Sequence, residues 1–133
     1  MHVSRYIETE NSRPFVWGET DCATRADRWF KLMCGYSPMQ RFGRLVMNEG
    51  LGRAWLAQHG GVVRAMRDVM KCTESAVLNG TPSAGDIGIV VVNDRAAISI
   101  FDGNLWSSRD VDGPIFANDE HRYIAWEVAC HRH

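Results

Sequence analysis

Hydrophobic residues in the first half of the chain recur at the spacing of amphipathic helices. The clearest case follows Asp21, where apolar residues return every three or four positions to mark one face of a helix. These residues are Cys22, Ala26, Trp29, Phe30 and Met33. Thr20 is a favourable N-cap and Gly35 a favourable C-terminal stop. The pattern predicts a helix from Thr20 to Gly35, with Cys22 in its first turn.

Shorter helical segments are predicted on either side of this helix. Residues 1–12 are predicted to form an arm or a short helix anchored by Tyr6 and Ile7. The other predicted segments are residues 37–43, 48–61 and 62–71. Ser37-Pro38 combines an N-cap with a first-turn proline, and Gly43 interrupts the segment that it opens. The first half of the protein is therefore expected to be helical.

The second half of the chain has the pattern of short strands separated by turns. After Lys71, β-branched residues become frequent, and the turn sequences Asn93-Asp94 and Asp102-Gly103 interrupt the apolar runs. The predicted strands are Ile87–Val92, Ala96–Phe101, Asn104–Ser108 and Tyr123–Ala129. Helices followed by an antiparallel meander indicate an α+β fold, with N-terminal helices packed on a small antiparallel sheet or open β-barrel.

Length and composition favour a single domain covering residues 1–133, of which 45% are hydrophobic and 23% charged. The formal net charge of −1 provides no basic field, which argues against a nucleic-acid partner. The longest apolar run, Ile87 to Val92, is too short to span a bilayer, and the N-terminus lacks the apolar run of a signal peptide. We expect a protein made and kept in a cytoplasm unless something else carries it out.

The four cysteines contain no C-x-x-C pair, so the sequence predicts free thiols rather than a disulfide framework or a zinc site. Cys34, Cys72 and Cys130 are interpreted as small buried hydrophobic residues. Cys130 with His131 and His133 could bind a metal ion, but a frayed chain end is the preferred interpretation. No metal ion and no other cofactor is expected.

Cys22 is the candidate nucleophile. The backbone N–H groups and the dipole at a helix N-terminus favour a thiolate, and the same N–H groups can stabilise an oxyanion. A cysteine nucleophile also needs a base to take its proton. On the helix alone, a small apolar residue filling the first turn is the preferred alternative.

Several short motifs occur in an order that is informative. Phe15-x-Trp17-Gly18 precedes Asp21-Cys22, and residues 82–87, Pro-Ser-Ala-Gly-Asp-Ile, lead into an apolar strand. This arrangement resembles the NlpC/P60 group of papain-like cysteine peptidases. The resemblance is closer to the branch found in phage tails and prophages, and it covers nearly the whole chain. The matching segments of that branch also include Arg41-Phe42-Gly43-Arg44, Gly60-Gly61 and Ala125-Trp126.

The resemblance implies a papain-like fold, with Cys22 as nucleophile and with Trp17, Asp21 and Asp86 along a substrate groove. Each of these three also has a structural interpretation, because Trp17 can be a core residue, Asp21 can favour the helix N-terminus, and Asp86 can bind backbone N–H groups in a turn. The resemblance further implies a location in the virion tail after synthesis in the host cytoplasm. Other tail proteins, and bacterial peptidoglycan as a substrate, are the implied partners.

The chain departs from the family at the catalytic base. Ala97 stands where the family's histidine would be expected, and general acid–base help is worth about 10²–10⁴-fold in rate. His121 is the one histidine worth testing as a substitute base, and Ser107 or Ser108 corresponds to the family's third polar residue. We therefore expect a structural or assembly protein of the phage tail with a degenerate peptidase site. The alternative is an active cysteine peptidase that cuts cell-wall peptides during phage entry.

Overall fold

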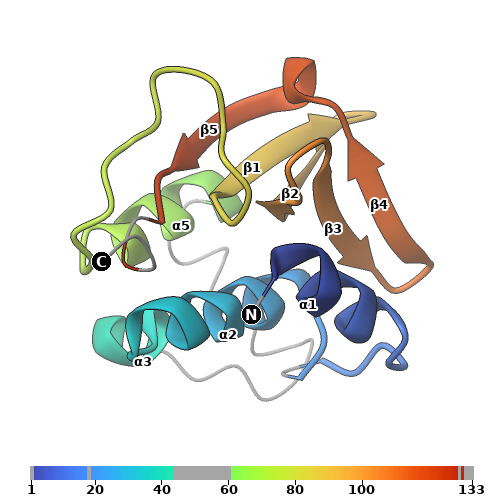
Figure 1. Ribbon diagram of the computed structural model, residues 1–133, viewed down its shortest axis with the longest axis horizontal. Helices are drawn as coiled ribbons and strands as arrows, with labels where there is room; N and C mark the ends of the chain where they lie inside the picture. Colours follow the sequence, from blue (N-terminus) through green and yellow to red (C-terminus); the bar gives the residue numbers. More distant parts are fainter. Residues whose placement is uncertain (1, 18, 44–60, 129, 131–133) are drawn as a thin grey trace.

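The structure is a computed structural model that describes residues 2–17, 19–43, 61–128 and 130 (Figure 1). Its helices are α1 (Val3–Asn11), α2 (Cys22–Cys34), α3 (Pro38–Phe42) and α5 (Val62–Met70), with a short 3-10 helix at Asp119–His121. Its strands are β1 (Ile87–Val92), β2 (Arg95–Phe101), β3 (Trp106–Asp110), β4 (Gly113–Ala117) and β5 (Arg122–Trp126). The expected α+β class is confirmed.

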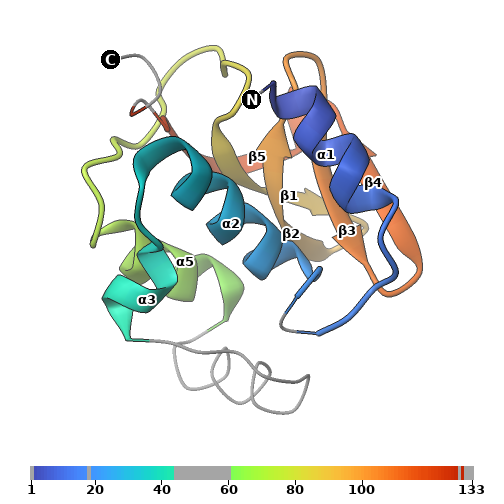
Figure 2. The ribbon, with the colours of Figure 1, turned by 60° about the horizontal axis from the view of Figure 1, so that its bottom comes forward.

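The five strands form one open sheet in the order β4-β3-β2-β1-β5, and every neighbouring pair is antiparallel. The β1–β2 hairpin turns at Asn93 and Asp94, which both have positive φ angles, of 51° and 63°. Such a turn matches the right-handed twist of the flanking strands. Figure 2 shows α1 beside β3 and β4, and α2 beside β1 and β2, so the helices cover one face of the sheet.

Strand alternation divides the core between the two faces of the sheet. The face towards the helices carries Ile87, Ile89, Ile98 and Ile100, which pack with residues of α1 and α2 such as Trp29. The opposite face carries a second, smaller cluster. That cluster consists of Val90, Phe101, Trp106, Ala117 and Ala125, with Leu78, Val92 and Ala97 packed against it. On β5, the neighbours Ala125 and Trp126 lie in different clusters, and this strand ends at Trp126 rather than at the predicted Ala129.

Helix α2 agrees with the sequence except at its cap. Cys22 is its first residue, and Gly35 ends it in the left-handed conformation at φ 84°. The predicted N-cap, Thr20, is wrong: Asp21 is the cap and accepts a hydrogen bond from the Thr24 N–H. The Thr20 hydroxyl instead donates to the Pro14 carbonyl and accepts from the Val16 N–H, so it closes the loop before the helix.

The other boundaries show where turn residues mislead. Ser37 caps α3 as predicted, and α5 agrees with the predicted segment. Strand β4 was not predicted, because Gly113 and Pro114 indicate a turn; at a sheet edge, however, a proline is tolerated. The helix predicted at residues 48–61 falls almost entirely outside the described residues.

The prediction of free cysteines is wrong for one pair. Cys34 and Cys130 form a disulfide, with Cα atoms 5.1 Å apart although 96 positions separate them in sequence. Folding brings the end of α2 to the segment after β5, which spacing along the chain does not reveal. Among the described residues, Cys22 and Cys72 are free.

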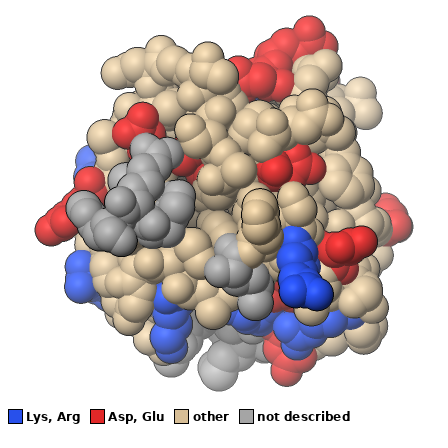
Figure 3. Space-filling model, viewed as in Figure 1, with Lys and Arg blue, Asp and Glu red and all other residues tan. Residues whose placement is uncertain are grey.

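Two surface properties bear on possible partners. On the face shown in Figure 3, Lys and Arg gather over the layer of helices with acidic side chains among them, so this face presents no extended surface of one sign. No described helix combines the length and apolar character needed to cross a membrane.

Candidate functional site

Cys22 lies at the N-terminus of α2, where this helix packs against β2. The residue is half-buried and contacts the main core. The backbone of Ile98 on β2 lies close enough to its thiol to lower the thiol's pKa. The thiol of the candidate nucleophile therefore faces the sheet, at the point where the helix begins.

The environment of this thiol favours the neutral form. Burial raises the pKa of Cys22, and the charge of Asp21 adds to this increase. The Ile98 backbone, the Arg25 charge and the Ala23 backbone lower the pKa without cancelling the effect of burial. Burial therefore opposes the thiolate that the helix end favours, and the pKa of Cys22 lies above its usual value.

On the buried face of α2, Arg25 is the polar residue that follows Cys22 most closely in sequence. Only 1% of Arg25 is exposed. Its Nη2 donates to the Ser107 hydroxyl at 2.8 Å and its Nη1 to the Ser107 carbonyl at 3.3 Å. Although burial lowers the pKa of Arg25, a guanidinium stays protonated at ordinary pH. Arg25, whose charge acts on the thiol, is thus a cation that cannot accept a proton.

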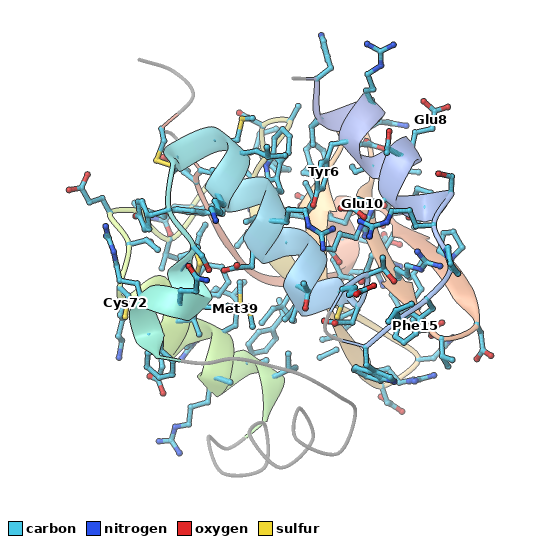
Figure 4. The ribbon with its side chains drawn as sticks, turned by 90° about the horizontal axis from the view of Figure 1, so that it is seen from below. Tyr6, Glu8, Glu10, Phe15, Met39 and Cys72 are labelled. Carbon is cyan, nitrogen blue, oxygen red and sulfur yellow. A yellow bond between two sulfur atoms is a disulfide. The ribbon has the colours of Figure 1, made fainter. Side chains whose placement is uncertain are left out.

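A buried polar network extends from Arg25 to α1. The Tyr6 hydroxyl donates to the Arg25 carbonyl at 2.6 Å, and the buried Glu10 carboxylate accepts from Arg13 and Arg28. Figure 4 shows Tyr6 and Glu10 directed from α1 towards α2, whereas Glu8 points away. The network fixes α1 against α2 by hydrogen bonds and ion pairs, which is a structural role.

Arg109 connects the same network to the sheet. Its Nη1 donates to the Glu10 carbonyl at 2.9 Å, and its guanidinium lies 5.7 Å from the centre of the Phe15 ring. Glu10 is near the C-terminal end of α1, where a cation is favoured by the helix dipole. Arg25 and Arg109 thereby join β3 to both helices.

Ala97 does not face Cys22. It packs with the second cluster, on the face of the sheet away from α2, whereas its neighbour Ile98 belongs to the main core. By strand alternation, Ala96 and Ile100 share the Ile98 face, and Ala96 is exposed. An imidazole at position 97 would therefore point away from the thiol.

His121 is also separated from Cys22. It ends the 3-10 helix between β4 and β5, where its Nε2 lies 3.6 Å from Glu120. In the same short helix, Asp119 accepts a hydrogen bond from the Trp106 indole, which belongs to the second cluster. Among the residues that the structure describes, no histidine contributes to the pKa shift of Cys22.

The three residues expected along a groove occupy different environments. Trp17 is 37% exposed and packs edge-to-face on Phe15. The Asp21 carboxylate accepts from the Thr24 backbone N–H and hydroxyl. Asp86 is fully buried and accepts from the Ser83 and Val128 backbone N–H groups. Of the three, only Trp17 is open to a ligand. Asp86 binds backbone N–H groups at a turn, as its structural interpretation predicted.

Sequence reasoning missed Arg25. An arginine three positions after Cys22 and four before Trp29 lies on the apolar face of the helix. A charged residue at such a position must either bind a partner or carry a cost of burial. That signal was present in the sequence, but its partner, Ser107, is 82 positions away and could not be assigned without the fold.

Comparisons with known proteins add a family but no described function. No curated protein and no solved structure matched the chain. Residues 1–128 match the model of DUF6950, a domain of unknown function. Because this match covers almost the entire sequence, the chain belongs to the DUF6950 family.

Proposed function

We propose that this protein is a phage tail component of NlpC/P60-like, papain-like fold whose peptidase site is degenerate, and that its role in the tail tip or in tail assembly is structural. One observation carries the loss of activity: burial raises the pKa of the Cys22 thiol, and no histidine among the described residues contributes to this shift. The phage setting comes from the resemblance in sequence alone.

The architecture supports the likeness in fold. Helices precede an antiparallel sheet, and a cysteine begins the helix that packs on the second strand of that sheet. The order of the sequence motifs supports it independently. Fold-level analogy does not establish activity, so the argument about function depends on the site.

Proton transfer argues against efficient hydrolysis. Cleavage of a peptide by a thiol requires one group to take the thiol proton and to return a proton to the leaving amine. Arg25 cannot do this, and its Nη1 and Nη2 groups donate to Ser107. Without the base, a rate lower by about 10²–10⁴-fold is expected from general acid–base catalysis alone.

An active cell-wall peptidase is the second candidate. The observation in its favour is the position of Cys22 as the first residue of α2, where backbone N–H groups can stabilise an oxyanion. In that case the thiol would need to lose its proton to a group that approaches only with the substrate.

Two measurements test the proposal. Purified peptidoglycan is incubated with wild type and Cys22→Ala, and soluble fragments are quantified; we expect equal, background release from both. Particles produced by the phage or prophage that encodes the chain are then examined by mass spectrometry and immuno-electron microscopy, where the protein should be found in tails. Release of fragments that disappears in Cys22→Ala would support the peptidase instead, and absence of the protein from tails would refute the structural role.

A further inference from the structure

We propose that Cys34 and Cys130 form a redox-sensitive latch, in which a reversible disulfide fastens the segment after β5 to the end of α2. In the dithiol form this corner loosens while the domain stays folded. The inference does not depend on the proposed function, since it concerns the fold of the chain and not its site.

The bond joins two parts of the fold that meet at one corner. Cys34 is the last residue of α2, and Cys130 lies two positions after the buried Val128. Both cysteines pack at the margin of the main core. Figure 2 shows the C-terminal end of α2 close to the described segment that follows β5, and Figure 4 shows the disulfide at this corner, away from Cys72.

Besides the disulfide, the segment after β5 is held by the fully buried Val128 side chain and by two backbone hydrogen bonds. The Glu127 N–H donates to the Ala76 carbonyl at 2.9 Å, and the Val128 N–H donates to Asp86 at 3.2 Å. Beyond Val128, the described attachments of Cys130 are the disulfide and its packing at the margin of the main core. Breaking the disulfide therefore releases Cys130 without removing any strand of the sheet.

The rest of the domain does not need this bond in order to fold. Most of the core lies between the sheet and helices α1 and α2, and includes Phe30, Ile89 and Trp126. A chain of 133 residues is well above the size at which disulfides are usually required for stability. The disulfide consequently adds stability to a fold that is complete without it, and this permits two folded redox forms.

The redox environment decides which form is present. Reducing compartments keep such thiols reduced, and oxidising surroundings allow the bond to form. With a low-molecular-weight disulfide as oxidant, the thiolate of one cysteine forms a mixed disulfide and expels one thiol, and the thiolate of the other then expels the second. The two cysteines lose two electrons to the oxidant, and their two protons end on the two thiols released.

The test uses the full chain in glutathione buffers of increasing oxidised fraction. Thiols are counted in denaturant: we expect two in the oxidised protein and four after reduction. Reduction should lower the midpoint of thermal unfolding by on the order of 10 °C, because a loop of this length gains much freedom in the unfolded state. Secondary structure at 25 °C should be retained, and hydrogen exchange of the Val128 amide should become faster.

Variants separate the latch from other thiol effects. Cys34→Ser and Cys130→Ser should each show the low midpoint and no response to reductant. Cys72→Ser, which changes a free cysteine, should respond like the wild type. Four thiols under oxidising conditions, an unchanged midpoint on reduction, or an unfolded dithiol form at 25 °C would each overturn the proposal.

Discussion

The Arg25 guanidinium on α2 donates to both the hydroxyl and the carbonyl of Ser107 on β3, at 2.8 and 3.3 Å. Both residues are buried, and the acceptors are neutral. A buried cation without a bonded carboxylate is costly to desolvate, so its hydrogen bonds must offset much of that cost. This pair therefore couples the helix that carries Cys22 to strand β3 of the sheet.

The coupling can be measured with a double-mutant cycle. Ser107→Ala and Arg25→Met should each lower the free energy of unfolding by about 1.5–3 kcal/mol, the usual range for a hydrogen bond to a charged group. The double variant should lose less than the sum, because each single change leaves a buried partner unsatisfied. Urea denaturation provides the values. Arg95→Met, at an exposed position, is the control, and additive effects of the two buried changes would contradict the coupling.

Gly88 tests the packing of the second cluster. A Cβ atom at this position would lie 2.9 Å from the Trp106 ring, which is fully buried and cannot retreat into solvent. Gly88→Ala should therefore lower the free energy of unfolding by about 1–3 kcal/mol through overpacking. Gly80→Ala introduces the same methyl group where no atom lies within 4 Å, and it should be nearly neutral. Equal unfolding midpoints for the two variants would show that the ring can move aside.

Local pattern was enough to predict the class of the fold and the position of Cys22, because helical periodicity and turn residues act over a few positions. Features that depend on distant residues could not be predicted: the Arg25–Ser107 pair and the Cys34–Cys130 disulfide join positions 82 and 96 residues apart. The Cys22 thiolate was predicted from the helix end alone. Its desolvation depends on the approach of β2, which the sequence does not show.

Two buried acids predict a loss of stability at alkaline pH. Burial raises the pKa of both Cys22 and Tyr6, so the folded chain keeps protons that the unfolded chain loses above about pH 8.5 for a thiol and about pH 10 for a phenol. The unfolded state then binds fewer protons, and the free energy of unfolding falls as pH rises. Below those values neither group changes stability with pH.

Cys22→Ala should accordingly reduce the fall in the free energy of unfolding that begins at about pH 8.5. Tyr6→Phe should reduce the fall that begins at about pH 10. Urea denaturation between pH 7 and 11 gives the slopes. Tyr6→Phe also removes the hydrogen bond to the Arg25 carbonyl, at a cost of about 1 kcal/mol at every pH. Cys72→Ala is the matched control, and identical slopes in Cys22→Ala and Cys72→Ala would be evidence against the burial of the Cys22 thiol.

The geometry of β2 also predicts where a base would have to be placed. The Ile98 backbone contacts the thiol, and Ala96 lies on the same face of the strand, whereas Ala97 packs into the second cluster. In Ala96→His the imidazole would extend from the face of β2 that Ile98 shares, and we expect it to accept the proton of Cys22. In Ala97→His the same group lies on the other side of the sheet.

We therefore expect iodoacetamide to alkylate Cys22 faster in Ala96→His than in wild type at pH 7.5. The rate should rise on the order of tenfold for each unit by which the imidazole lowers the pKa of the thiol. Ala97→His should react at the wild-type rate. Peptide mass spectrometry follows Cys22 and Cys72 in the same sample, so Cys72 reports any general loosening of the fold. A faster reaction in Ala97→His alone would contradict the strand register. No change in either variant would mean that burial, rather than the missing base, keeps the Cys22 thiol unreactive.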